Sequence, residues 1–214
     1  MSERISELKP RPRNRVVVRL AGGRFFTIPD EQAHTLSVGL ELSDREVDRL
    51  DQMDQYFRGR EKALRLIALR MRTRQEVATA LGKIEVREPV LSGILGELED
   101  TGLVDDANFA REFARARADV RFMGPHRLRY DLVKRGVRRD IVDSALGETF
   151  DETSQEAQAW ALVDRKFGNV VVDEKMVRRV SGLLRRKGYD YEIVNRVSYE
   201  LLRRAGSENA AEEP

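Results

Sequence analysis

The chain of 214 residues contains no cysteine, which excludes disulfides, thiolate metal sites and cysteine nucleophiles and fits a reducing cytoplasm. Its 39 Lys and Arg residues nearly balance 37 Asp and Glu residues, so the net charge of +2 favours no class of partner, and only local clusters of cations can do so. Aromatic residues make up 7% of the chain and apolar runs are only a few residues long, a composition that favours small helical modules over a β-sandwich or a membrane-spanning protein.

The N-terminal part of the chain is predicted to contain a short β segment. Residues 1–14 are polar and basic, and we expect a disordered arm there. In residues 15–28, two β-rich runs flank Gly22 and Gly23, and glycine allows the positive φ angles of a hairpin turn. A single hairpin is only marginally stable in water, so it should pack on the helices that follow it.

From residue 42 onward, apolar residues recur at helical spacing. Ser43 and Glu46 form a capping box, in which a hydroxyl and a carboxylate each satisfy an unpaired amide at the start of a helix. Thr73 and Glu76 have the same spacing at the start of a later helix. Gly59 either ends the first of these helices or only weakens it, and the sequence leaves both readings open.

One pattern recurs along the helical part. The stretches LVKRGVRRDIV and LRRKGYDYEIV, around Gly136 and Gly188, share a leucine, a basic cluster, a glycine and a final Ile-Val, and lie about 50 residues apart. A third copy upstream keeps the apolar positions but has Glu85 in place of the glycine. Because glycine suits the left-handed backbone that ends many helices, we expect the turn at Glu85 to differ from the other two.

A period near 50 in three copies predicts a mainly all-α fold of tandem three-helix repeats in an elongated array, with a small N-terminal β-hairpin and helix segment. The predicted segments are a disordered basic arm (1–14), a hairpin with helices (15–60), repeat 1 (61–104), repeat 2 (105–150), repeat 3 (151–204) and a disordered acidic tail (205–214). The predicted helices of the three repeats are 61–71, 73–81 and 89–100, then 106–120, 125–134 and 138–146, then 153–166, 174–186 and 191–203.

No catalytic constellation is visible in the sequence. His34 and His126 are the only histidines and lie in different regions, and no glycine-rich phosphate-binding motif is present. Asp105 and Asp106 could form a two-metal ligand set, but acids at the start of a helix more simply cap it. We therefore expect a protein that is not an enzyme and has no metal or cofactor.

Basic residues concentrate in the second helix of repeat 2, in the same helix of repeat 3, and at the exits of both helices. Arginine dominates these clusters, and its planar guanidinium is suited to bidentate contact with carboxylates or phosphates. The clusters are either ordinary solvated helix faces or a repeated basic stripe that faces an acidic protein groove or a nucleic-acid backbone. The candidate contact residues are Arg127, Arg129, Lys134, Arg135, Arg138, Arg139, Lys175, Arg178, Arg179, Arg185, Arg186 and Lys187.

The sequence resembles the RecX family of recombinase regulators over about residues 61 to 204. The resemblance rests on a D-D-x-x-F-A segment, on a G-x-x-R-[LI]-x-x-x-L-x-x-[KR]-G-[IV] helix, and on an R-[ST]-x-x-E-[LV] element in the first repeat. The matching residues are Asp105, Asp106, Phe109 and Ala110, then Gly124, Arg127, Leu128, Leu132, Arg135, Gly136 and Val137, and finally Arg72, Thr73, Glu76 and Val77.

The resemblance implies a regulator of DNA repair, homologous recombination and the SOS response. RecX-like proteins bind the filament of RecA on single-stranded DNA, lie in its helical groove, and inhibit its ATP hydrolysis, extension and strand exchange. By this analogy the chain is a monomeric, cytoplasmic RecA inhibitor with possible direct DNA contact, no membrane partner and no cofactor.

An alternative is a helical DNA-binding module with no recombinase partner. Residues 73–104 also look like a winged helix-turn-helix, as in a transcription regulator, but helical rather than β-hairpin sequence follows where the wing should be. A general binder of single-stranded DNA is the other form of this alternative. Either would bind bare DNA tightly with a steep salt dependence, whereas a filament regulator would prefer the filament.

Overall fold

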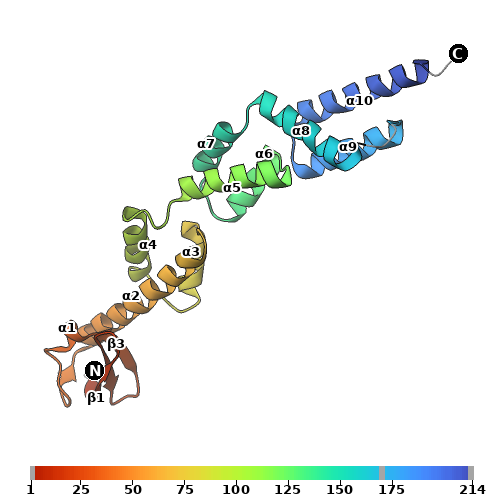
Figure 1. Cartoon of the computed structure of the whole chain (residues 1–214). Helices are drawn as coiled ribbons and strands as arrows, with labels where there is room; N and C mark the ends of the chain where they lie inside the picture. Colours follow the sequence, from red (N-terminus) through yellow and green to blue (C-terminus); the bar gives the residue numbers. More distant parts are fainter. Residues whose placement is uncertain (1–2, 169–171, 212–214) are drawn as a thin grey trace. The chain divides into compact units, whose positions relative to one another are not determined.

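The computed structural model describes residues 3–168 and 172–211, which are mainly helical with a small sheet at the N-terminal end (Figure 1). The chain divides into two compact units, Met1–Val104 and Asp105–Pro214. None of the described helices combines the length and the apolar character that a bilayer crossing requires.

The first unit begins with a four-stranded antiparallel sheet. Its strands are β1 (Glu3–Arg11), β2 (Arg15–Leu20), β3 (Phe25–Pro29) and β4 (Glu41–Leu42), in the spatial order β3-β2-β1-β4. The β2–β3 hairpin forms around the paired glycines, as the sequence predicts, and Gly23 has a φ of 86°.

Strand β1 lies where the sequence predicts a disordered arm, so that prediction is wrong for the described residues from Glu3 onward. Residue Ile5 is 1% exposed, and the main chain of β1 pairs with β2 along most of its length. Pro10 has no amide hydrogen to donate, but this removes no hydrogen bond to β4, because β4 pairs only with the start of β1. A polar strand that gains its stability from backbone pairing with a neighbour leaves little hydrophobic pattern in the sequence.

A short helix, α1 (Asp30–Ala33), leads to the long helix α2 (Asp44–Leu69). The predicted capping box starts α2: the amide of Ser43 donates to Glu46 (2.7 Å) and the amide of Glu46 donates to the Ser43 hydroxyl (3.4 Å). Gly59 does not end this helix. It is buried where a Cβ would lie 2.7 Å from Ile94, so its missing side chain lets two helices approach closely.

Helix α2 serves both the sheet and the first repeat, so the boundary predicted near residue 60 falls inside one helix. Figure 1 shows α2 running from the sheet to α3 (Arg74–Gly82) and α4 (Val90–Asp100), which complete the first repeat. Apolar residues from these three helices form one core, and Val77, Leu81 and Ile94 are fully buried in it.

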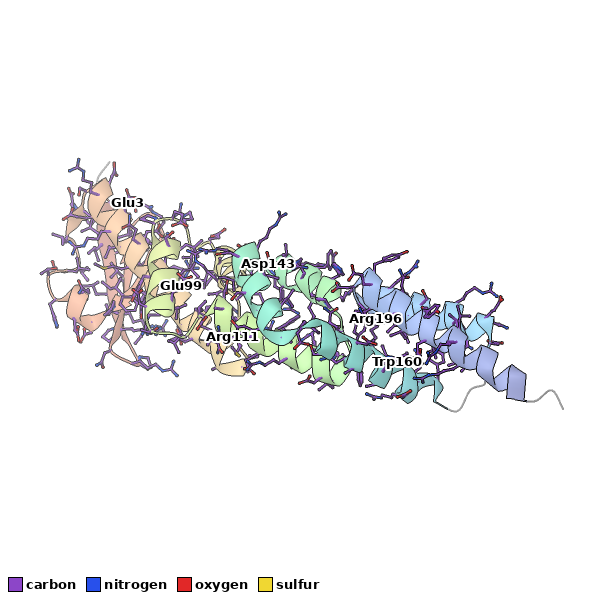
Figure 2. The ribbon with its side chains drawn as sticks, turned by 90° about the horizontal axis from the view of Figure 1, so that it is seen from above. Glu3, Glu99, Arg111, Asp143, Trp160 and Arg196 are labelled. Carbon is purple, nitrogen blue, oxygen red and sulfur yellow. The ribbon has the colours of Figure 1, made fainter. Side chains whose placement is uncertain are left out.

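The second unit contains the other two repeats, each with its own hydrophobic core. Repeat 2 has α5 (Asp106–Arg121), α6 (Pro125–Lys134) and α7 (Arg139–Thr149). Repeat 3 has α8 (Glu152–Phe167), α9 (Glu174–Lys187) and α10 (Tyr191–Ala211), and Figure 2 shows Trp160 on α8 and Arg196 on α10. The prediction of a mainly helical fold with tandem three-helix repeats is confirmed.

Helix α10 extends beyond Arg203, where the sequence predicts its end, and continues through Ala211. The prediction of a disordered tail from residue 205 is therefore wrong up to Ala211, and its last three residues lie outside the described part. Alanine and glutamate are good helix formers, and extending an existing helix requires no new nucleation.

The same turn joins the second and third helices of all three repeats. Its central residue is left-handed in each copy, with φ of 61° at Glu85, 82° at Gly136 and 85° at Gly188. The next residue donates a backbone hydrogen bond to the leucine that precedes the turn; these 3.2 Å bonds join Val86 to Leu81, Val137 to Leu132 and Tyr189 to Leu184. The expectation that Glu85 changes the first turn is wrong, because glutamate adopts the glycine conformation there at some cost in strain.

Candidate interaction surfaces

Helix α9 has one basic face and one buried face. Its cations recur at spacings of three and four residues, which places them on the side of the helix opposite the core. The exposed cations of this face are Lys175, Arg178, Arg179, Arg185 and Arg186. The buried residues are Met176, Val177, Val180, Leu183 and Leu184.

Carboxylates compensate little of the charge on this α9 basic face. Within the described residues, Glu174 is the one acid that pairs with it, 3.7 Å from Arg178 and largely exposed. Arg179 instead lies over the ring of Phe167 (5.5 Å), and Arg185 lies 6.0 Å from the centre of the Tyr191 ring. These aromatic contacts orient the guanidinium groups and leave their charge available to a partner.

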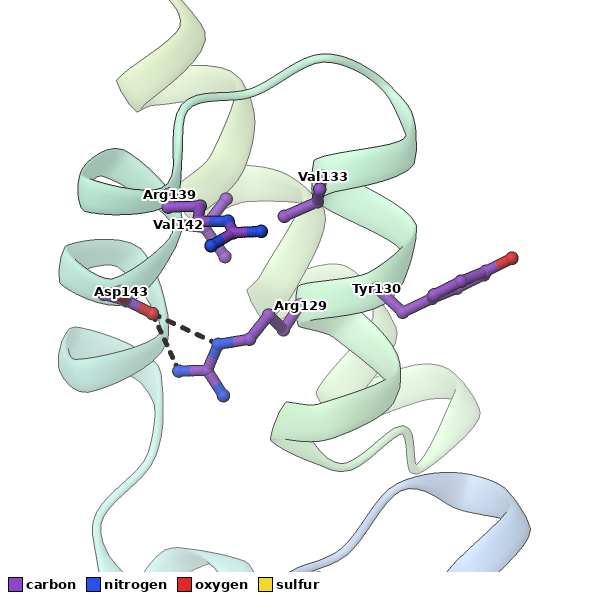
Figure 3. Close-up of a pocket in the computed structure, with 6 residues that line it drawn as sticks. All are labelled: Arg129, Tyr130, Val133, Arg139, Val142 and Asp143. Carbon is purple, nitrogen blue, oxygen red and sulfur yellow. Dashed lines mark hydrogen bonds and ion pairs between the residues drawn. The ribbon is translucent and has the colours of Figure 1, made fainter.

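The second repeat has a hollow between α6 and α7, with a volume of about 380 Å³ (Figure 3). Arg129 spans it and donates two hydrogen bonds to Asp143, at 3.1 and 2.8 Å. Arg139, Val133 and Tyr130 also line this hollow, and the ring of Tyr130 extends outward from it (Figure 3). The charge of Arg129 is therefore already satisfied within the repeat.

Tyr130 is 58% exposed and has a cation one helical turn away on each side. Arg127 lies 5.7 Å and Lys134 6.0 Å from the centre of its ring. Arg127 also pairs with Asp131 at 3.4 Å. This part of α6 therefore offers an exposed aromatic ring between two cations.

The remaining predicted cations of repeat 2 have structural partners. Arg138 pairs with Asp140, and this hydrogen-bonded carboxylate raises the pKa of the Arg138 side chain. Arg135 lies over the ring of Phe113, 5.1 Å from its centre, and covers an aromatic residue of the core. Three of the predicted arginines of repeat 2, Arg127, Arg129 and Arg138, thus pair with a carboxylate, whereas Arg178 is the one that does so on α9 among the described residues.

Lys187 points toward the junction of repeats 2 and 3. Its ammonium group donates to the backbone oxygen of Arg121 at 2.5 Å. Burial, followed by the nearby charges of Lys166, Arg121 and Arg165, lowers the pKa of Lys187. These three neighbours are not among the contact residues predicted from the sequence, because they lie at the C-terminal ends of α5 and α8 and only the tertiary fold brings these ends to Lys187 on α9.

Repeats 2 and 3 are joined at this junction by backbone contacts. The amide of Gly124 donates to Lys187 (2.9 Å) and the amide of His126 to Gly188 (3.0 Å), while the His126 ring contacts Asp190 at 2.8 Å. A Cβ at Gly188 would lie 2.4 Å from the backbone nitrogen of Arg127. The repeated glycine therefore permits close packing here as well as a left-handed turn.

Asp105, one of the two acids considered as metal ligands, caps a helix, as does Asp173. The carboxylate of Asp105 accepts from the amide of Asn108 (2.9 Å), and that of Asp173 accepts from the amide of Met176 (2.6 Å). In the part of the chain that the structure describes, no group of three or more His, Asp or Glu residues is arranged to hold a metal ion.

Comparison with known proteins identifies the family. Residues 60–98 match the family description "RecX, first three-helix domain" and residues 105–146 match "RecX, second three-helix domain". A regulatory protein RecX from Amycolatopsis mediterranei is 32% identical over 158 residues, which cover 73% of this chain and 90% of the relative. The chain belongs to the RecX family.

Other RecX proteins agree with this assignment. A regulatory protein RecX from Oceanobacillus iheyensis is 28% identical over 78% of this chain, which spans only 62% of that longer relative. A crystal structure of regulatory protein RecX matches with a TM-score of 0.67 and 23% identity, over 90% of this chain and 97% of the other, and supports the fold. The family resemblance expected from the sequence is confirmed.

Proposed function

We propose that this RecX-family protein is a non-enzymatic, cytoplasmic regulator that docks as a monomer on the filament of a RecA-type recombinase on single-stranded DNA. Docking inhibits ATP hydrolysis, filament extension and strand exchange. Family membership supports the proposal, since the relatives are named regulatory proteins. The recombinase supplies the ATP chemistry, so the regulator needs only a surface.

The structural observation that supports the proposal most strongly is the α9 basic face. Five cations share one face of a helix whose other face is held in the core, and one exposed acid pairs with that face among the described residues. A partner that presents carboxylates or phosphates gains charge-assisted hydrogen bonds from these side chains. Arginine loses little conformational entropy for each hydrogen bond that it forms, because its guanidinium is planar, and Arg179 already lies over an aromatic ring.

The surface of α6 supplies a second contact in the same unit. Tyr130 between Arg127 and Lys134 combines apolar area with positive charge, a combination common in interface hot spots. Arg129 and Arg139 flank it at the hollow of repeat 2. We assign these residues a supporting role, because Arg127 and Arg129 already have carboxylate partners.

The test is single-stranded-DNA-dependent ATP hydrolysis by the cognate recombinase, titrated with this protein. We expect hydrolysis to fall at near-equal amounts of the two proteins. The triple variant Arg178→Glu, Arg185→Glu and Arg186→Glu should lose about tenfold in potency, since three exposed ion pairs of about 0.5 kcal/mol each sum to roughly one factor of ten.

A matched control reverses three exposed cations of the first unit, Arg45, Arg49 and Lys83, which have no ion pair among the described contacts. This control should inhibit like the parent protein. Unchanged hydrolysis at saturating parent protein rejects the proposed function. An equal loss of potency in the control rejects the α9 basic face as the contact.

A further inference from the structure

The junction of repeats 2 and 3 contains a hollow of about 470 Å³ that the proposed function does not use. Four of the residues that line it are cations: Arg121, Arg165, Lys166 and Lys187. They come from the C-terminal ends of α5, α8 and α9, three helices that the fold brings together. We call this group the junction cluster.

The junction cluster has no internal counter-charge. Within residues 3–168 and 172–211, none of its four cations is paired with a carboxylate. Lys187 is tied to the end of α5 through the backbone oxygen of Arg121, so its role is partly structural. Arg121, Arg165 and Lys166 are exposed, and Arg165 lies 5.5 Å from the centre of the Phe122 ring.

Like charges gathered around one hollow repel one another. Burial, followed by the positive charges of Lys166, Arg121 and Arg165, lowers the pKa of Lys187. An anion bound between them would relieve the repulsion and gain charge-assisted hydrogen bonds. Because folding itself gathers the cations, the side chains lose less conformational entropy on binding, which favours a specific site over diffuse attraction.

The apolar side chains beside the cations indicate which anion fits. Val120 is 69% exposed at the rim, and Phe122 is half-buried against the core of repeat 3. A free phosphate would contact only the cations, whereas a nucleotide of a single strand also presents a sugar and an unpaired base to apolar neighbours. A duplex keeps its bases stacked inside and offers only its phosphates.

We propose that the junction cluster binds the phosphodiester backbone of single-stranded nucleic acid. Arg121, Arg165 and Lys166 contact phosphates, and Val120 and Phe122 contact the adjoining sugar or base. This site lies outside the α9 basic face, and it requires no recombinase.

The test is fluorescence anisotropy of a labelled oligothymidylate of about 20 nucleotides, a length that spans several binding sites. The full chain is titrated at salt concentrations between about 50 and 200 mM, because the slope of log affinity against log salt counts the phosphates contacted. The double variant Arg121→Gln and Lys166→Gln is compared with the control Arg45→Gln and Lys83→Gln, which removes the same charge from exposed positions of the first unit.

The junction variant should bind more weakly, and its salt slope should be smaller by about 1.4, since each lost contact with a single strand removes about 0.7. The control should keep the parent slope, and a duplex of the same length should bind more weakly than the single strand. Circular dichroism should show equal folding of all three proteins.

Three results overturn the inference. The first is absence of measurable binding by the parent at the lowest salt concentration. The second is equal slopes in the junction variant and the control. The third is preference for a polyglutamate peptide of equal charge, lost in the junction variant, which would assign the cluster to an acidic protein. None of them affects the proposed function, because no recombinase is present in this assay.

Discussion

Replacing Gly188 by alanine tests whether the repeated glycine joins repeats 2 and 3. Gly188 is buried and has a φ of 85°, and a Cβ there would meet the backbone nitrogen of Arg127 at 2.4 Å. Backbone cannot rotate away as a side chain can, so the start of α6 must move. The movement breaks the hydrogen bonds from Gly124 to Lys187 and from His126 to Gly188.

The magnitude follows from two contributions. An L-residue in the left-handed conformation destabilises the fold by about 1–2 kcal/mol. Alanine also lowers the conformational entropy of the unfolded chain relative to glycine, which offsets about 0.4–1 kcal/mol of this strain. Two lost hydrogen bonds add about 0.5–1.5 kcal/mol each. We therefore expect Gly188→Ala to lower the free energy of unfolding of the second unit by about 3 kcal/mol, the middle of the range that these values span.

Gly136→Ala is the matched control, because Gly136 occupies the same turn of repeat 2 with a φ of 82° but is exposed. It should cost only the backbone strain, about 1 kcal/mol. Urea unfolding followed by circular dichroism gives the free energies, and the fluorescence of Trp160, the only tryptophan, reports on repeat 3.

Hydrogen exchange gives a more local measurement. The amides of Gly124 and His126 should exchange at least tenfold faster in Gly188→Ala and unchanged in Gly136→Ala, since only the first substitution opens the junction. Equal costs for the two substitutions, together with preserved protection of both amides, would refute the reasoning.

Three further predictions concern the first unit. Glu85→Gly should raise its free energy of unfolding by about 1 kcal/mol in urea, because glycine relieves the left-handed strain; a decrease would contradict this reading of the turn. Ser43→Ala should lower the same free energy by about 1 kcal/mol by removing the cap of α2, and an unchanged unfolding midpoint would contradict the cap. Hydrogen bonds from Tyr56 (2.6 Å) and Arg60 (2.7 Å) lower the pKa of Glu97. The stability that these bonds contribute is therefore fully present above the ordinary pKa of glutamate, and it is lost as the pH falls through the lowered pKa. Unfolding midpoints of Glu97→Gln should therefore fall less than those of the parent as the pH is lowered through that range, and equal falls would contradict the role of the carboxylate.

The helices of the repeats could be predicted well because their signals are local. Helix α6 begins at Pro125 and ends at Lys134, the bounds that its proline and the following glycine predict. The capping box at Ser43 likewise marks the start of α2. The repeat itself is visible because each copy must bury the same apolar stripe.

The errors arise where a partner distant in sequence decides the structure. Strand β1 is ordered by backbone pairing with β2, which leaves little pattern in its own residues. The sequence also leaves open whether Gly59 ends its helix, and only the packing of Ile94 against it decides that the helix continues. The sequence predicts Lys187 as a contact residue, a prediction that stays open, but it does not show that the fold brings Lys187 to Arg121, Arg165 and Lys166. A cluster of this kind cannot be predicted from local sequence, because its side chains come from the ends of three helices that meet only in the tertiary fold.

The most direct test of the central claim is the affinity of this protein for preassembled recombinase filaments and for bare single-stranded DNA, each at about 50 and 200 mM salt. Docking through the α9 basic face predicts tighter binding to the filament than to the bare strand at both salt concentrations. It also predicts that reversing Arg178, Arg185 and Arg186 weakens filament binding while the control in the first unit does not. Equal affinity for filament and bare strand, or filament binding that survives the reversal, would contradict it.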